Sequence, residues 1–103
     1  MKVTKISERN FAEEVLQAKE TVLIDFYADW CGPCKMLSPL VDKIAEDYPD
    51  VKVCKVNVDE ENALAAKFGV MSIPKLVVMQ NGKIVNSSLG YQPYDSLKSL
   101  LKV

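Results

Sequence analysis

The chain has 103 residues, a formal net charge of -1, 49% hydrophobic residues and 26% charged residues. This length and hydrophobic content predict one compact domain over residues 1–103. The small net charge does not favour nucleic acid or a membrane surface as a partner, and no apolar stretch approaches transmembrane length. The segment from Met1 to Lys5 lacks a signal-peptide core, so a cytoplasmic location is expected, with a processed precursor as the alternative.

The first elements in the chain are a short strand and an amphipathic helix. Val3 to Ile6 predicts the strand, and Ser7 is a suitable N-cap for the helix. Phe11, Val15 and Leu16 then share one helical face. This part of the chain is expected to contribute packing and no chemistry.

Thr21 to Ala28 is a nearly continuous apolar run, which predicts a central strand covered on both faces. Asp25 interrupts the run. A buried carboxylate is costly unless it is paired, and burial should raise its pKa. The functional interpretation is a proton acceptor beneath the cysteines that follow. The alternative is an Asp at an edge or on the surface, because Asp is poorly suited to strand interiors.

Residues 30–34 read Trp-Cys-Gly-Pro-Cys and stand between this strand and a helical pattern over residues 35–48. The arrangement predicts a strand, a tight turn and a helix. It places Cys31 at the first turn of the helix and Cys34 one turn later on the same side. Pro33 suits the first helical turn because its missing N–H would be unpaired there.

This geometry predicts thiol–disulfide exchange. Free N–H groups and the helix dipole favour a thiolate at Cys31, and Lys35 adds a nearby cation. Cys34 should lie deeper and be less exposed. Cys31 is then expected to attack a target disulfide, and Cys34 to resolve the mixed disulfide.

Zinc binding and an inert pair are the alternatives for the two cysteines. A structural zinc site needs four Cys or His ligands. The chain has no His and one further cysteine, Cys54, so redox chemistry is favoured.

The helix after the motif contains Pro39, which should kink it, and ends near Pro49. Val51 to Val58 predicts a strand with alternating faces. Its Cys54 is interpreted as a small buried hydrophobe, with a regulatory thiol as the alternative. Lys55 could lie close to Asp25, or could be a solvated Lys near the strand end.

The next segment predicts a helix and a proline turn. Asp59 can cap a helix that ends at Gly69 in the C′ position. Ile73-Pro74 is either a proline at the edge of the sheet or a cis-proline turn, and the sequence alone slightly favours the trans peptide bond.

The last segment predicts a hairpin and a final helix. Leu76 to Gln80 and Lys83 to Leu89 are its strands, and Asn81-Gly82 is its turn. Gly90 ends the second strand, and Pro93 opens the helix. The order β-α-β-α-β-α-β-β-α predicts an α/β fold with a central mixed five-stranded sheet, parallel in its first part and antiparallel in its last two strands, with helices on both faces.

Over essentially its whole length the sequence resembles the thioredoxin family. The resemblance rests on the following matches: Asp25 within Val-Leu-Ile-Asp-Phe-Tyr-Ala, residues 30–36 (Trp-Cys-Gly-Pro-Cys-Lys-Met), Pro39, residues 55–59 (Lys-Val-Asn-Val-Asp), Ile73-Pro74, Asn81-Gly82 and Gly90. It implies the thioredoxin fold and a cis Pro74 packed against the cysteines.

The resemblance also implies roles for individual residues. Asp25 is the buried acid and Lys55 modulates it, while Gly32, Pro33 and Lys35 tune the cysteine pair. An apolar surface for a partner's extended segment comprises Trp30, Gly32, Ile73, Pro74, Leu89, Gly90 and Tyr91.

Five positions depart from the usual family pattern: Lys75 follows Pro74 in place of Thr, Tyr91 replaces a small residue, Tyr27 stands where Trp is frequent, and Met71-Ser72 is unusual. Lys75 adds a cation that could bias the protein toward acidic partner segments. These departures bear on partner preference and not on the reaction.

The sequence therefore predicts a protein-disulfide reductase that serves as an electron donor in redox homeostasis. Its expected partners are oxidised target proteins and a thioredoxin reductase, and a monomer is expected. No cofactor is expected on this chain, because NADPH serves the reductase and no dinucleotide site is visible. The alternatives are a redox-responsive protein-binding module, and a disulfide oxidase or isomerase if the protein is exported.

Overall fold

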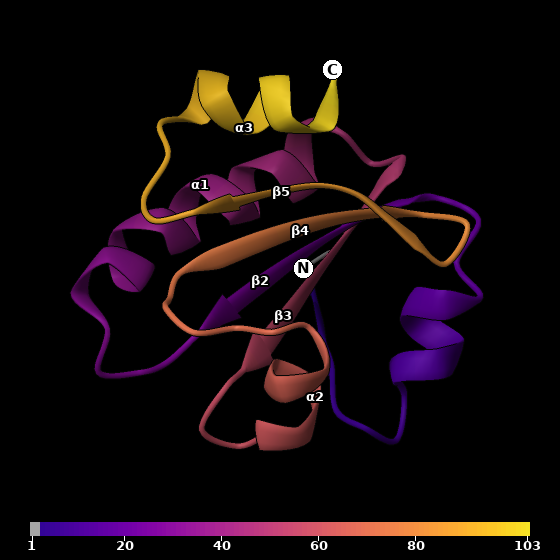
Figure 1. Ribbon diagram of the computed structural model, residues 1–103. Helices are drawn as coiled ribbons and strands as arrows, with labels where there is room; N and C mark the ends of the chain where they lie inside the picture. Colours follow the sequence, from indigo (N-terminus) through magenta and orange to yellow (C-terminus); the bar gives the residue numbers. More distant parts are fainter. Residues whose placement is uncertain (1–2) are drawn as a thin grey trace.

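The computed structural model describes residues 3–103. Met1 and Lys2 lie outside the described residues. Both belong to the domain expected over residues 1–103 and to the N-terminal segment that lacks a signal-peptide core. The elements are β1 (Val3–Lys5), the π-helix η1 (Ala12–Leu16), β2 (Thr21–Tyr27), α1 (Gly32–Asp47), β3 (Val51–Asn57), α2 (Asn62–Lys67), β4 (Lys75–Gln80), β5 (Lys83–Leu89) and α3 (Tyr94–Leu101) (Figure 1). The predicted element order is confirmed, and the first helix is a short π-helix.

The five strands form one mixed sheet in the order β1-β3-β2-β4-β5. β3 runs parallel to both β1 and β2, whereas β4 is antiparallel to β2 and β5 is antiparallel to β4. β2 lies at the centre, as its apolar run predicts, and its residues from Val22 to Phe26 are buried. The sheet therefore has the predicted parallel first part and antiparallel end.

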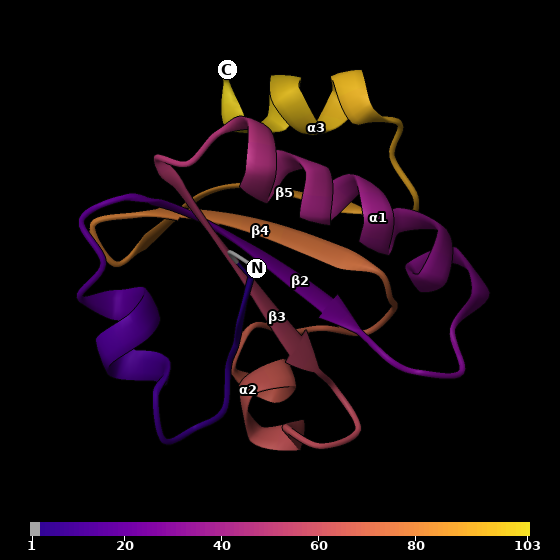
Figure 2. The ribbon, with the colours of Figure 1, turned by 180° about the vertical axis from the view of Figure 1, so that it is seen from behind.

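Helices cover both faces of the sheet, as Figures 1 and 2 show from opposite sides. Because successive strand residues point to opposite faces, β2 and β3 supply two separate cores. One core lies between the sheet, η1 and α2 and includes Val15, Ile24, Phe26, Cys54, Val56 and Leu64. The other lies under α1 and α3 and includes Leu23, Leu37, Val41, Ile44, Val53, Leu97 and Leu101.

The turn residues follow the sequence pattern. Asn81 and Gly82 have φ angles of 53° and 77°, the two positive values that a tight hairpin turn needs. Gly69 has φ 63° and follows Phe68, the C-cap of α2, and the N–H groups of Gly69 and Val70 donate to the carbonyls of Ala66 and Ala65. These bonds close the helix end as predicted.

The two predicted N-caps are wrong. The N–H of Ser7 donates to Asn10 Oδ1 at 2.8 Å, so Asn10 forms a turn there and η1 begins only at Ala12. Asp59 precedes α2, whose N-cap is Glu61 without a side-chain bond. In both places a nearby Asn side chain satisfies the local N–H groups, which displaces the helix start toward the C-terminus.

Pro39 lies inside α1, and the helix continues through it to Asp47. Its end just before Tyr48 confirms the predicted stop near Pro49. Among residues 3–103, no helix combines the length and the apolar character needed to cross a membrane.

We expect the core under α1 to dominate stability. Ile44 is fully buried in α1, whereas Ile84 on β5 is 56% exposed, so the same substitution can be compared at the two sites. Ile44→Ala should lower the free energy of unfolding by about 2–5 kcal/mol because it leaves a cavity. Ile84→Ala should lower it by less than about 1 kcal/mol. Denaturant unfolding at unchanged m-value measures both, and equal losses would contradict this assignment of the core.

Candidate active site

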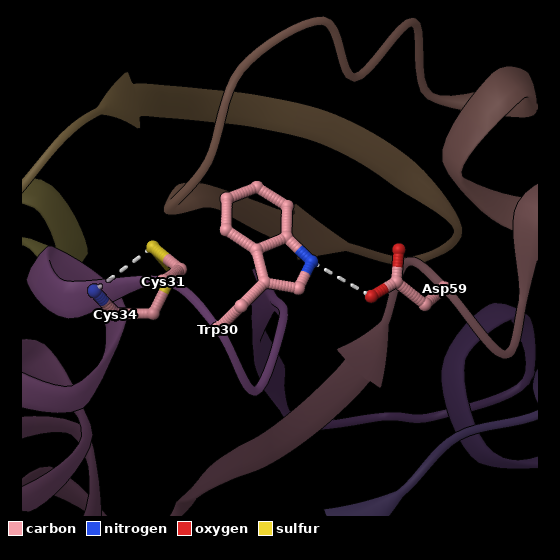
Figure 3. Close-up of a disulfide and its surroundings, with 4 residues drawn as sticks. All are labelled: Trp30, Cys31, Cys34 and Asp59. Carbon is pink, nitrogen blue, oxygen red and sulfur yellow. Dashed lines mark hydrogen bonds between the residues drawn. A yellow bond between two sulfur atoms is a disulfide. The ribbon is translucent and has the colours of Figure 1, made fainter.

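The cysteine pair lies where the chain leaves the central strand and enters α1. Cys31 is the N-cap of α1, with extended backbone (φ -87°, ψ 111°), and Pro33 lies in the first turn, as predicted. Cys31 and Cys34 form a disulfide with their Cα atoms 5.2 Å apart. The N–H of Cys34 donates to Cys31 Sγ at 3.2 Å (Figure 3). The helix end therefore directs an N–H group at the sulfur of the first cysteine.

The two cysteines are almost equally buried, at 4% and 3% exposed for Cys31 and Cys34. The predicted contrast in exposure is therefore absent in the disulfide form. Ala28 is buried with both cysteines, and Tyr27, Val58 and Ile73 pack against this cluster. Apolar neighbours from three parts of the chain thus shield both sulfur-bearing side chains.

Trp30 is the exposed neighbour of the disulfide, with 71% of its surface accessible. Its Nε1 donates to Asp59 Oδ2 at 2.9 Å, as Figure 3 shows. Asp59 is itself held by a turn, in which its N–H donates to Asn57 Oδ1 at 2.9 Å. Sequence reasoning missed this role and assigned Asp59 to a helix cap. The Asn-x-Asp spacing, typical of an Asx turn, is the signal that could have found it.

Pro74 forms a cis peptide bond with Ile73, so the implication of the family resemblance is confirmed and the slight preference for trans from sequence alone is wrong. Gly90 has φ 85°, and its N–H donates to the carbonyl of Pro74 at 2.8 Å. This bond joins the start of β4 to the end of β5. Two predicted surface positions far apart in the sequence are thereby brought together.

A groove of about 410 Å³ runs beside the disulfide and is lined by Trp30, Val58, Val70, Met71, Ser72 and Ile73. Met71 is 95% exposed, and the sequence did not assign it to the partner surface. Leu89 and Tyr91 are exposed but do not line this groove. Residues 70–72, which were not predicted to belong to the partner surface, therefore line a groove together with Trp30 and Ile73.

Lys75 turns its ammonium toward the end of α2. Its Nζ donates to the carbonyl oxygen of Phe68 at 3.3 Å. Phe68 is the C-cap of α2, where unpaired carbonyls favour a cation. The Lys75 ammonium, which was expected near the dithiol, therefore binds the start of the loop over residues 68–74.

Asp25 is only 1% exposed, and its Oδ1 has no hydrogen-bond partner among the described residues. The alternative of an edge or surface Asp is therefore wrong. Burial raises the pKa of Asp25 to about 6; the ammonium of Lys55 opposes this rise and the carboxylate of Asp42 adds to it. A carboxyl group with this pKa can exchange a proton near neutral pH.

Lys55 lies beside Asp25 in the register of the parallel strands β2 and β3. Its Nζ is 2.5 Å from Ser38 Oγ and 3.2 Å from Asp42 Oδ1. Sequence reasoning found the proximity of Lys55 to Asp25 and missed Ser38 and Asp42. Their spacing of four and eight residues from Cys34 along the helix was the available signal.

A cleft of about 520 Å³ connects these groups, and it is lined by Asp25, Tyr27, Ala28, Asp29, Cys34, Lys35, Ser38 and Lys55. The cleft opens the buried carboxyl group toward the second cysteine and toward solvent. Asp25 and Cys34 therefore line one common cleft.

Cys54 takes no part in this site. It is fully buried in β3, and burial raises the pKa of its thiol to about 12. The interpretation as a small buried hydrophobe is confirmed. Within residues 3–103, no three or more His, Cys, Asp or Glu side chains form a group that could hold a metal ion.

Comparison with known proteins decides the family. A family model described as Thioredoxin matches residues 2–103. The chain belongs to the thioredoxin family. A thioredoxin of Porphyra purpurea is 42% identical over 98% of this chain and 95% of its own length. Thioredoxin 1 of Synechococcus elongatus is 43% identical over 93% of this chain and 91% of its own length, and a thioredoxin of Bacillus subtilis is 39% identical over 98% and 96%.

This membership, the mixed sheet and the Cys31–Cys34 disulfide confirm the expected fold and reaction. The fold is the thioredoxin fold. The protein is a protein-disulfide oxidoreductase of the thioredoxin family and works as a protein-disulfide reductase.

The raised pKa of Asp25 predicts a pH-dependent stability. The folded state holds this proton more tightly than the unfolded state, so stability is full below the unfolded pKa of 3.8 and is lost as pH rises through about 6. The gain in free energy of unfolding from Asp25→Asn should therefore grow by about 2.4 kcal/mol between about pH 4 and about pH 7.5. Denaturant unfolding across this range measures it.

The exposed Asp50 supplies the matched control, and Asp50→Asn should show no such growth. If the unfolding curves of Asp25→Asn and wild type run parallel across the pH range, Asp25 titrates alike in the folded and unfolded chain.

Proposed function

We propose that Cys31 is the attacking thiol, Cys34 the resolving thiol and Asp25 the acceptor of the Cys34 proton. One observation supports this assignment above the others: Cys34 of the disulfide lines a cleft together with Asp25, a buried carboxyl group with one unpaired oxygen. Each role below follows from that arrangement.

In the first step the reduced protein attacks a target disulfide. The N–H of Cys34, which donates to Cys31 Sγ, is available to a Cys31 thiolate, as is the positive end of the α1 dipole. The thiolate forms a bond to one target sulfur and the target disulfide breaks. The other target sulfur leaves as a thiolate and takes a proton from water.

In the second step Cys34 resolves the mixed disulfide. Its thiol gives a proton to the Asp25 carboxylate through the cleft, and the Cys34 thiolate attacks Cys31 Sγ. The Cys31–Cys34 bond forms, the Cys31–target bond breaks, and the second target thiolate leaves and takes a proton from water. Two electrons have then passed from the two cysteines to the target, whose disulfide has become two thiols.

The target segment is proposed to bind across Trp30, Ile73, Pro74, Leu89, Gly90 and Tyr91, with Lys75 behind them. Exposed Trp30, Leu89 and Tyr91 support an apolar docking surface, and the groove beside Trp30 can accept a side chain of the target. Gly32, Pro33 and Lys35 are proposed to tune the cysteine pair, since they form the first helical turn around it.

The family membership supports the rest of the reaction cycle. We propose that a thioredoxin reductase re-reduces the disulfide with electrons from NADPH, which binds the reductase and not this chain. We further propose that the protein works as a monomeric electron donor in the cytoplasm.

The two cysteines should behave differently when each is replaced. Cys31→Ser should abolish reduction of a disulfide-bonded protein substrate by dithiothreitol through this protein, because the attacking sulfur is gone. Cys34→Ser should accumulate a mixed disulfide through Cys31, which mass spectrometry of the trapped complex detects. Cys54→Ala is the matched control and should keep the activity, since Cys54 is buried outside the site. Full activity in Cys31→Ser would overturn the mechanism.

The redox midpoint distinguishes a reductase from an oxidase or isomerase. Equilibration in graded dithiothreitol buffers, followed by Trp30 fluorescence, should give a midpoint more negative than the glutathione poise of about -220 to -260 mV. Such a midpoint requires a dedicated electron supply, as proposed for the reductase. A clearly more positive midpoint would favour the oxidase or isomerase and an oxidising compartment.

A further inference from the structure

A polar stripe on α1 continues inward from the resolving cysteine. Cys34, Ser38 and Asp42 are spaced four residues apart, so they lie on one face of the helix. That face looks toward Lys55 on β3, whose ammonium contacts both Ser38 and Asp42. The stripe therefore joins the second cysteine to the cation beside the buried carboxyl group.

The ammonium of Lys55 is bound to the helix and not to its neighbour on the sheet. Asp25 and Lys55 are register partners on adjacent strands, yet Asp25 Oδ1 has no hydrogen-bond partner among the described residues. Lys55 Nζ instead donates a hydrogen bond to Ser38 Oγ at 2.5 Å and forms an ion pair with Asp42 Oδ1 at 3.2 Å. Asp42 Oδ1 itself accepts no hydrogen bond among the described residues, so its hold on the ammonium is electrostatic. Water could also solvate the ammonium if Lys55 were exposed, but the Lys55 side chain is only 18% exposed.

We propose that Ser38 and Asp42 are positioning residues that hold the Lys55 ammonium on α1, and so leave the Asp25 carboxylate unpaired and ready to accept a proton. The inference rests on the proposed role of Asp25 as acceptor of the Cys34 proton. It adds two residues of α1 to the site, neither of which takes part in the exchange of sulfur bonds.

The charge balance around Asp25 supports this role. Several titratable groups face Asp25 or share its cleft. They are Lys55 on β3; Cys34, Lys35 and Asp42 on α1; Tyr27 at the end of β2; and Asp29 just after it. On the other side, β4 places the apolar Leu76 beside Asp25. Lys55 lowers the pKa of Asp25, and Asp42 raises it. An ammonium that moved from Asp42 onto Asp25 would stabilise the carboxylate and make it a weaker base.

Asp42→Asn tests the proposal directly. It removes the anionic anchor of Lys55, so the ammonium should pair with Asp25, the remaining carboxylate beside it. The titration of Asp25, followed by carbon NMR of its carboxyl group in the oxidised protein, should move to lower pH. Glu46→Gln removes one charge from an exposed position of the same helix and should leave the titration unchanged.

Ser38→Ala and a double-mutant cycle separate positioning from charge alone. Ser38 is uncharged and lines the same cleft as Asp25, so loss of its hydroxyl would by itself make the cleft less polar and raise the pKa of Asp25. A downward shift in Ser38→Ala therefore indicates movement of the Lys55 ammonium. In a Lys55→Met background the shift caused by Asp42→Asn should shrink, because no ammonium remains to be released. An undiminished shift in that background, or no shift in Asp42→Asn, would overturn the proposal.

Single-turnover kinetics separate this inference from the proposed function. The rate of resolution of a Cys31-linked mixed disulfide is measured against pH for wild type, Asp42→Asn and Glu46→Gln. The acid limb of the profile should move to lower pH in Asp42→Asn and its plateau should fall several-fold, as expected for a weaker base. If the Asp25 titration moves and the rate profile does not, the positioning stands and the role of Asp25 as acceptor fails.

Discussion

The main energetic constraint on this structure is a carboxyl group that is buried without a full set of hydrogen-bond partners. Asp25 lies in the central strand with one oxygen unpaired, and burying such a group costs free energy. The compensation comes from the two apolar cores on either face of β2, which are built from its immediate neighbours in sequence. Burial of neighbouring residues such as Ile24 and Phe26 thus offsets the free-energy cost of burying Asp25 between them.

The sheet order explains how the site is assembled. Because β2 lies between β3 and β4, it has Lys55 on one side and Leu76 on the other, and its end leads directly to the disulfide. The chain before β4 supplies Pro74, which is bonded to Gly90 beyond β5. α1 then extends back over the sheet and brings Ser38 and Asp42 to the inner side of the same site. Segments remote in sequence meet because one strand is central.

Much of this could be predicted from the sequence, for identifiable physical reasons. The strand and helix periods gave the element order, and the apolar surroundings of Asp25 indicated its burial. The cis state of Pro74 came from the family resemblance, because local sequence alone does not determine the peptide isomer. The predicted caps at Ser7 and Asp59 are wrong: the N–H groups of these two residues donate to neighbouring Asn side chains, and the helices begin only at Ala12 and Asn62. Ser38 and Asp42 were missed because their role depends on where Lys55 points, which only the packing of α1 on β3 determines.

The burial of Cys54 has a consequence for thiol stoichiometry. The folded chain has three cysteines, of which Cys54 is shielded and Cys31 and Cys34 are paired in the disulfide. Any thiol that a hydrophilic reagent detects in the folded protein should therefore come from Cys31 or Cys34 after reduction, whereas Cys54 should become detectable only on unfolding. Thiol titration of the folded protein then reports only on the redox state of Cys31 and Cys34. The additional thiol that is detected in denaturant reports on unfolding around Cys54.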